Sequence, residues 1–123
     1  MSAKPHPANV PGDFYVAQGC CLACGVWETE APGLLDWLEE GEFPSCYVAR
    51  QPETDAEFRQ MMRAMQVNEV DCLRVRDCKP EWAQELCRNR LGAQIDNEET
   101  RVEAERAIRP RGFLGVLAAL WPR

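Results

Sequence analysis

Three of the seven cysteines in this 123-residue chain lie within five residues, in the segment Gly19-Cys20-Cys21-Leu22-Ala23-Cys24-Gly25. Thiols at this spacing bind a metal, lie buried or pair as disulfides. The start of the chain, 1–11, contains three prolines and no apolar run of the kind that an export signal needs. Metal binding or buried thiols are therefore expected before disulfides. The odd number of cysteines also leaves at least one thiol outside any disulfide scheme.

The most apolar stretch of the chain, Gly112–Trp121, is ten residues long. This is about half of the ~20 residues that a membrane-spanning helix requires. Together with the absence of an export signal, it predicts a cytoplasmic protein without a membrane partner. An exposed apolar stretch would be adhesive, so it packs either on its own domain or on a partner, and we expect the first.

The charge balance is acidic, with 20 acidic residues against 14 basic residues and a formal net charge of −6. Proteins that bind nucleic acid neutralise phosphates with clustered lysine and arginine, so this balance disfavours a nucleic-acid partner. It suits a protein partner with a basic surface, and it equally suits solubility alone.

Strand and helix patterns alternate along the chain. Residues 1–12 are expected to form a flexible arm, because three prolines block regular pairing. The patterns predict strands over 13–16, 46–50 and 70–76. They predict helices over 31–40, from Thr54 onward, over 80–91 with Leu91-Gly92 closing it, and over 97–108.

The helix beginning at Thr54 has the clearest signal. Thr54 and Glu57 form a capping box, in which each side chain satisfies a backbone N–H near the helix start. Apolar residues then follow at helical spacing: Phe58, Met61, Met62 and Met65. Such a face can be a binding surface, but beside strands it is expected to be core.

The pattern as a whole predicts an α+β fold with a small antiparallel sheet and helices on one face. The expected organisation is a domain over 13–92, after the arm, followed by a C-terminal helical and apolar extension over 93–123. The helix over 97–108 has only a thin apolar face, supported by a charge pair between Arg101 and Glu105.

The segment Cys21-Leu22-Ala23-Cys24-Gly25-Val26, followed by Ala31-Pro32-Gly33-Leu34-Leu35, resembles the opening of a bacterial single-cluster ferredoxin. In that family a C-x-x-C-x-x-C loop is followed by a C-P pair and a short helix. The strands predicted over 13–16 and 46–50 also fit the family. The resemblance covers 13–76 and implies a ferredoxin-like fold with an iron–sulfur cluster held by cysteine thiolates.

The ligand set that the resemblance implies is incomplete. Counted from Cys21, the third ligand position holds Trp27, and the position of the C-P cysteine holds Ala31. The last ligand would fall near Val67 or Asn68, and neither is a thiol. Clusters are normally held by four thiolates, so the electron transfer of the family does not carry over directly.

Two further cysteines offer a way to rebuild the site. Cys46 begins a predicted strand and Cys72 lies on the closing one, so a candidate set is Cys21, Cys24, Cys46 and Cys72. Four sulfurs suit a cluster or a tetrahedral zinc ion, although a zinc ribbon would show a second C-x-x-C pair. We expect no cofactor, with buried thiols at these positions. An iron–sulfur cluster or zinc is the alternative.

The function expected from these features is a non-catalytic, ferredoxin-like protein-binding module. The single histidine, His6, lies in the predicted arm, so histidine-based catalysis has no candidate. The expected partner has a basic surface, and one form of the hypothesis is a bacterial immunity protein that neutralises a toxin domain. The alternative is an electron carrier with a rebuilt cluster site, whose partner is a redox protein.

Overall fold

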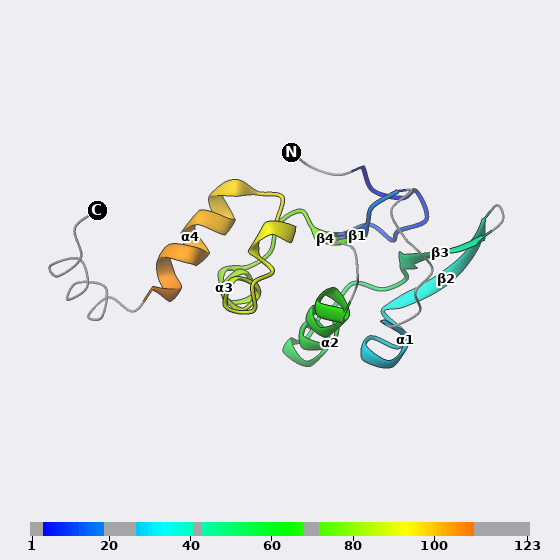
Figure 1. Ribbon diagram of the computed structural model, residues 1–123, viewed down its shortest axis with the longest axis horizontal. Coiled ribbons are helices and arrows are strands. Elements are labelled where there is room, and N and C mark those ends of the chain that lie inside the picture. Colours follow the sequence, from blue (N-terminus) through cyan, green and yellow to red (C-terminus); the bar gives the residue numbers. More distant parts are fainter. Residues whose placement is uncertain (1–3, 19–26, 41–42, 68–71, 110–123) are drawn as a thin grey trace, which may run out of the picture.

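A computed structural model of the chain describes residues 4–18, 27–40, 43–67 and 72–109 (Figure 1). The elements follow the order β-α-β-β-α-β, and two further helices and a 3-10 turn come after the last strand. The elements are β1 (Phe14–Val16), α1 (Trp27–Glu30), β2 (Leu35–Glu40), β3 (Phe43–Val48), α2 (Asp55–Val67), β4 (Leu73–Val75), α3 (Pro80–Arg88), η1 (Gly92–Gln94) and α4 (Glu98–Ile108).

The α+β class is confirmed, but the described strands form two sheets of two strands rather than one sheet. β1 pairs with β4 in antiparallel register, with Phe14 opposite Val75. β2 and β3 form an antiparallel hairpin, with Trp37 opposite Cys46. Two-stranded ribbons are marginal alone, so both depend on the helices packed beside them.

The prediction of a helix over 31–40 is wrong, because most of this segment is strand β2. Leu34 donates its backbone N–H to the Ala31 carbonyl at 3.2 Å, and Gly33 has a φ of +84°. Proline followed by a glycine with positive φ is the pattern of a type II turn, not of a helix start. Beyond the turn, buried Leu35 alternates with exposed Asp36, as expected for a strand on the core.

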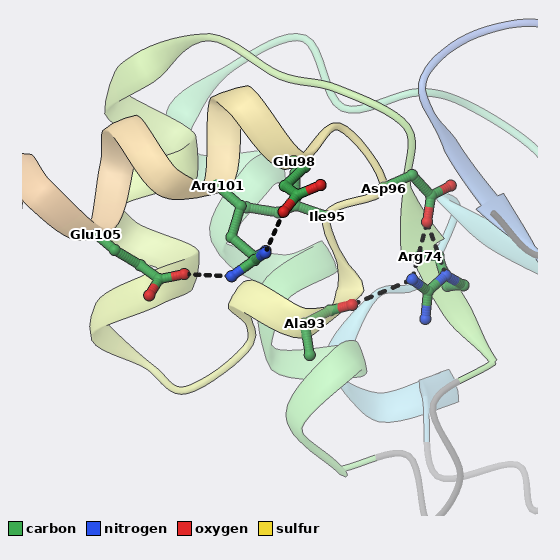
Figure 2. Close-up of a pocket in the computed structure, with 7 residues that line it drawn as sticks. All are labelled: Arg74, Ala93, Ile95, Asp96, Glu98, Arg101 and Glu105. Atoms are coloured by element: carbon green, nitrogen blue, oxygen red, sulfur yellow. Dashed lines mark hydrogen bonds and ion pairs between the residues drawn. The ribbon is translucent and has the colours of Figure 1, made fainter. Parts of the chain in front are cut away.

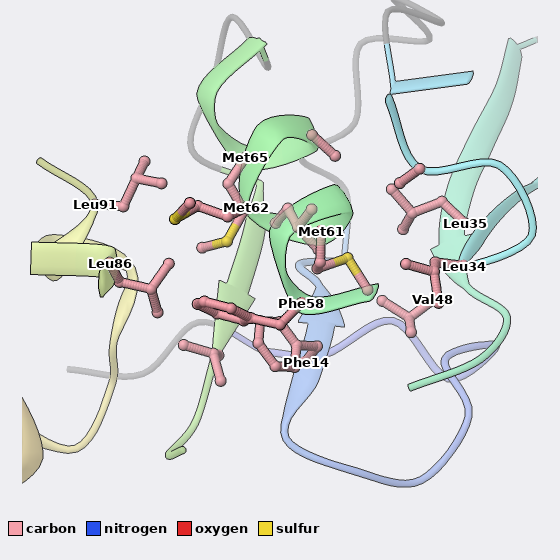
Figure 3. Close-up of a cluster of buried hydrophobic side chains, with 14 of the residues drawn as sticks. Phe14, Leu34, Leu35, Val48, Phe58, Met61, Met62, Met65, Leu86 and Leu91 are labelled. Atoms are coloured by element: carbon pink, nitrogen blue, oxygen red, sulfur yellow. The ribbon is translucent and has the colours of Figure 1, made fainter. Parts of the chain in front are cut away.

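Helix α2 confirms the prediction of a capped core helix. The Thr54 hydroxyl accepts the Glu57 backbone N–H at 3.1 Å, and the Glu57 carboxylate accepts the Glu53 backbone N–H at 2.9 Å. In a capping box the glutamate side chain accepts the backbone N–H of the N-cap residue itself, here Thr54. The Glu57 carboxylate instead accepts the N–H of Glu53, one residue earlier. Figure 3 shows the apolar face of α2 pointing into the buried cluster, where Phe58, Met61, Met62 and Met65 are all buried.

The described part of the predicted arm, 4–12, is hydrogen-bonded to both sheets through Asn9. The Asn9 amide oxygen accepts the backbone N–H groups of Val16 and Val48 at 3.1 and 2.9 Å. Pro5 also bridges Ala17, and His6 donates its backbone N–H to Val16. His6 is consequently buried within the fold.

The core is continuous across the boundary predicted at 92/93. Trp82 of α3 stacks on Phe58 of α2 with ring centroids 4.6 Å apart. Ile95 and Ala104 belong to the same buried cluster as the strands and α2. The helical extension is confirmed over Glu98–Ile108, and the remaining part of that prediction, 110–123, lies outside the described residues.

Helix α3 ends at Arg88, and Arg90 rather than the predicted Leu91-Gly92 makes the reversal. Arg90 has a φ of +63°. The backbone N–H of Leu91 bonds to the Leu86 carbonyl at 2.8 Å, and that of Arg90 bonds to the Cys87 carbonyl at 3.1 Å. These bonds define a Schellman motif, whose left-handed position is normally occupied by glycine.

Replacing Arg90 by glycine is therefore expected to stabilise the fold. The change removes about 1 kcal/mol of left-handed strain, partly offset by the greater freedom of glycine in the unfolded chain. Urea unfolding should show a net gain of roughly 0.5 kcal/mol. The control Arg90→Ala keeps the strain and should give no gain. A loss of stability in Arg90→Gly would contradict this account of the turn.

Candidate functional site

The four predicted ligand cysteines divide into two groups. Cys21 and Cys24 lie outside the described residues. Cys46 on β3 and Cys72 directly before β4 are both buried in one apolar cluster. Cys72 is disulfide-bonded, whereas Cys46 is a thiol. The expectation of a buried thiol is therefore confirmed at Cys46 and wrong at Cys72.

A four-thiolate cluster does not fit this set of cysteines in the state that the structure describes. Cluster and zinc ligands are thiolates, and the sulfur of Cys72 is instead committed to a disulfide. Among the described residues, no group of three potential metal ligands lies close together. The use of these four cysteines as ligands stays a prediction.

A buried polar network around Asp96 joins β1, β4 and the segment that leads into α4. The Asp96 carboxylate accepts from the Tyr15 hydroxyl and from the Arg74 guanidinium, whose Nε and Nη2 lie 3.0 and 2.8 Å from Oδ1. Arg74 Nη2 also donates to the Ala93 carbonyl at 3.1 Å (Figure 2). The side chains of Asp96 and Arg74 are only 5% and 17% exposed. Charges this well buried stabilise a fold only when each is paired, as here.

The network also affects the phenol of Tyr15. Burial raises the pKa of Tyr15 above 10.0, and the Asp96 carboxylate adds to the rise. The folded state thus favours the neutral phenol. The neutral phenol therefore contributes fully to the free energy of unfolding below pH 10. This contribution is lost as the pH rises through the raised pKa of Tyr15.

A second polar hub, Asp77, fixes α4 against the start of α3. Its carboxylate accepts from the Cys78 backbone N–H at 2.8 Å, from the Asn97 amide at 3.1 Å and from the Thr100 hydroxyl at 2.6 Å. Asn97 in turn caps α4, accepting the Thr100 backbone N–H at 3.2 Å. The two helices pack against each other.

A groove of about 440 Å³ lies between α3 and α4. Its apolar lining comes from small side chains, and its polar lining is acidic or neutral. The apolar residues are Cys78, Pro80, Ala104 and Ala107, and the polar ones are Asp77, Gln84, Glu99, Thr100 and Glu103. We refer to this feature as the α3–α4 groove.

Two carboxylates on one edge of the groove differ from the other acidic groups of α4. Glu98 and Glu105 pair with Arg101 at 3.8 and 2.8 Å, which confirms the predicted pair of Arg101 with Glu105 (Figure 2). Glu99 and Glu103 are exposed and pair with no basic group among the described residues. They lie one helical turn apart and border a second hollow, which is also lined by Glu98, Val102 and Arg106. Val102 is 38% exposed, unusually high for a large apolar side chain here.

Sequence reasoning missed the groove because it depends on how two helices pack. Ala104 and Ala107 give α4 only a thin apolar face, which predicts a surface helix and nothing about its neighbour. The sequence feature closest to the groove is Asp77, a polar residue just before the helix that begins at Pro80. Its partners on α4, Asn97 and Thr100, lie twenty or more residues away.

Searches of protein-family models, curated proteins and solved structures return no match to this chain. Within the described part of the chain, no helix has the length and apolar character needed to cross a membrane.

Substitution of Asp96 is expected to destabilise the fold strongly. Asp96→Ala leaves the Arg74 guanidinium and the Tyr15 hydroxyl buried without their partner, at a cost of about 3 kcal/mol. Urea unfolding measures the loss. The matched control is Glu85→Ala, which removes an exposed pair with Arg88 and should cost no more than ~0.5 kcal/mol. Equal losses in the two variants would contradict the role of the buried network.

The thiol of Cys78 is expected to react slowly in the folded protein. Burial, followed by the carboxylates of Asp77 and Asp13, raises the pKa of Cys78 from 9.0 to about 12. At pH 8 the thiolate is then about a thousandfold rarer than in the unfolded chain. A more basic thiolate is also more nucleophilic, which offsets part of this difference. Alkylation by iodoacetamide, followed at Cys78 by peptide mass mapping, should therefore be about tenfold or more slower without guanidinium than with it.

The raised pKa of Cys78 also predicts a loss of stability in alkali. The neutral thiol contributes fully below pH 9 and its contribution is lost as the pH rises toward 12. Cys78→Ala should lose less stability over this range than the parent chain does. Equal alkylation rates in the folded and unfolded chains would show that Cys78 is not shielded.

Proposed function

We propose that this chain is a non-catalytic, ferredoxin-like module that binds a protein partner with a basic surface. The order β-α-β-β-α-β of its first six described elements is that of a ferredoxin-like motif. The antiparallel pairing of the first strand with the last closes that unit on itself. These features support the scaffold that the resemblance implies.

The observation that carries the proposal is the helical unit added after the closing strand. The unit comprises α3, η1 and α4, and Figure 1 shows it at one end of the molecule, away from β2 and β3. Asp96 and Asp77 hold it in place through buried or partly buried polar bonds. A surface held in one arrangement loses little freedom on binding, which favours affinity.

The acidic charge supports the choice of partner. The chain carries a net charge of −6, and complementary charge accelerates association and excludes partners of like charge. One specific form of the proposal is an immunity protein, with a basic toxin domain as the partner that this chain neutralises.

A second candidate function is electron transfer through a rebuilt cluster. Its support is the burial of Cys46 and Cys72 in the same cluster of side chains. The disulfide of Cys72 and a thiolate ligand set are alternative states of the same cysteines, so this function requires the disulfide to be reduced.

Two measurements on the full chain separate the candidates. The chain is purified anaerobically under reducing conditions, and its iron content, acid-labile sulfide and visible absorption are recorded. The binding proposal predicts a colourless, folded protein without stoichiometric iron. It also predicts salt-sensitive binding, in titration calorimetry, to the basic product of a neighbouring gene.

The same measurements include variants as controls. A brown protein that loses its iron in Cys21→Ala and in Cys46→Ala would overturn the binding proposal in favour of the electron carrier. A zinc content near one per chain would instead indicate a structural metal module. Cys87→Ala is the matched control, because Cys87 lies outside the predicted ligand set.

A further inference from the structure

We infer that the α3–α4 groove is the docking site for a basic helical segment of a partner, which seats an apolar side chain between Ala104 and Ala107 and pairs its cations with Glu99 and Glu103. The inference rests on the proposed function and assigns it a surface. Helix-in-groove recognition combines apolar anchors with charged residues at their edges, and the groove offers both.

The shape of the groove favours a small apolar anchor. Its volume of about 440 Å³ is within the range of about 300–1,000 Å³ that is typical of ligand sites. Of the two alanines that line it, Ala104 is buried and Ala107 is exposed. Because Asp77 binds both the Cys78 backbone and Thr100, the groove is formed before any partner arrives.

The charge around the groove specifies the occupant. The groove lining includes Asp77, Glu99 and Glu103 but no lysine, arginine or histidine. None of these three carboxylates pairs with a basic group among the described residues. Asp77 is already hydrogen-bonded to the Asn97 amide and the Thr100 hydroxyl, so Glu99 and Glu103 are the carboxylates left for a cation of the partner. Val102, on the other flank of these two carboxylates, gives a second apolar contact for a segment that lies across this edge. One basic residue, Arg106, lines that flank, and the acidic residues there outnumber it. A cationic segment complements this surface, whereas an acidic one is repelled.

The test uses a synthetic helical peptide of about 14 residues, with leucine at i, i+3, i+4 and i+7 and lysine elsewhere. It is titrated into the full, ¹⁵N-labelled chain, and its affinity is measured by fluorescence anisotropy. The inference expects amide shifts concentrated in 78–84 and 99–107. It also expects no measurable binding of a peptide with glutamate in place of lysine, and weaker binding of one with glutamine in place of leucine.

Two variants separate charge from shape. Glu99→Lys/Glu103→Lys should weaken binding about tenfold or more, and Ala107→Leu should weaken it similarly by filling the groove without changing charge. The matched control is Asp36→Lys/Glu53→Lys, with the same charge change at two exposed carboxylates away from the groove. Circular dichroism checks that each variant remains folded.

Equal weakening in the control and in Glu99→Lys/Glu103→Lys would overturn the inference, because binding would then follow net charge. Amide shifts confined to elements other than α3 and α4 would also overturn the inference. In both cases the proposed binding function would stand, but the α3–α4 groove would not be its surface. If Ala107→Leu shifts the Trp121 indole signal before peptide is added, the occupant is the chain's own C-terminal segment. The assignment to a partner would then be wrong.

Discussion

The bond of Asp96 to both Arg74 and Tyr15 is the interaction on which the arrangement of the chain depends. Tyr15 lies on β1 and Arg74 on β4, and these two strands close the β-α-β-β-α-β unit. Asp96 lies beyond η1, so its carboxylate attaches the added helices to that closure. The attachment is buried and ionic, so it fixes direction as well as contact. Asp96 is the member that the other two share, and its removal leaves the buried charge of Arg74 without a counter-ion in the network. The closed unit and the added helices thus behave as one structure.

Helix α2 extends this coupling through the apolar core. Its face contacts the sheets on one side, and Phe58 stacks on Trp82 of α3 on the other. The Trp82 indole also donates to Asp55 at the start of α2, at 2.8 Å. The domain boundary predicted at 92/93 follows Leu91-Gly92, where a helix is expected to close before a charged segment with a thin apolar face. The charged residues of this segment form the exposed surface of a helix. Ile95 and Ala104 are buried in the same cluster as the strands and α2, so the core continues across the predicted boundary.

The elements that could be predicted from sequence are those whose signals are local. The capping box at Thr54 and the apolar spacing from Phe58 to Met65 identify α2, since cap and face are both satisfied within a few residues. The strand over Leu35–Glu40 was mistaken for a helix, because its identity comes from pairing with β3 and from the turn at Gly33. The groove is still less accessible, since it is the space left between two helices. The predicted ligand cysteines depend on chain segments brought together only in the folded state, and half of them lie outside the described residues.

The unpaired carboxylates of α4 carry an energetic cost that a partner can remove. Like charges at i and i+4 destabilise a helix by about 0.2–0.5 kcal/mol, and Glu99 and Glu103 have this spacing. The helix dipole compensates Glu99, near the N-terminus, more than Glu103, a turn further along. Arg101 lies between them in sequence but pairs with Glu98 and Glu105 on another face of the helix. The repulsion therefore persists in the free chain and is relieved when an external cation approaches this edge. A rigid groove adds to this effect, because the helices need no ordering at the moment of contact.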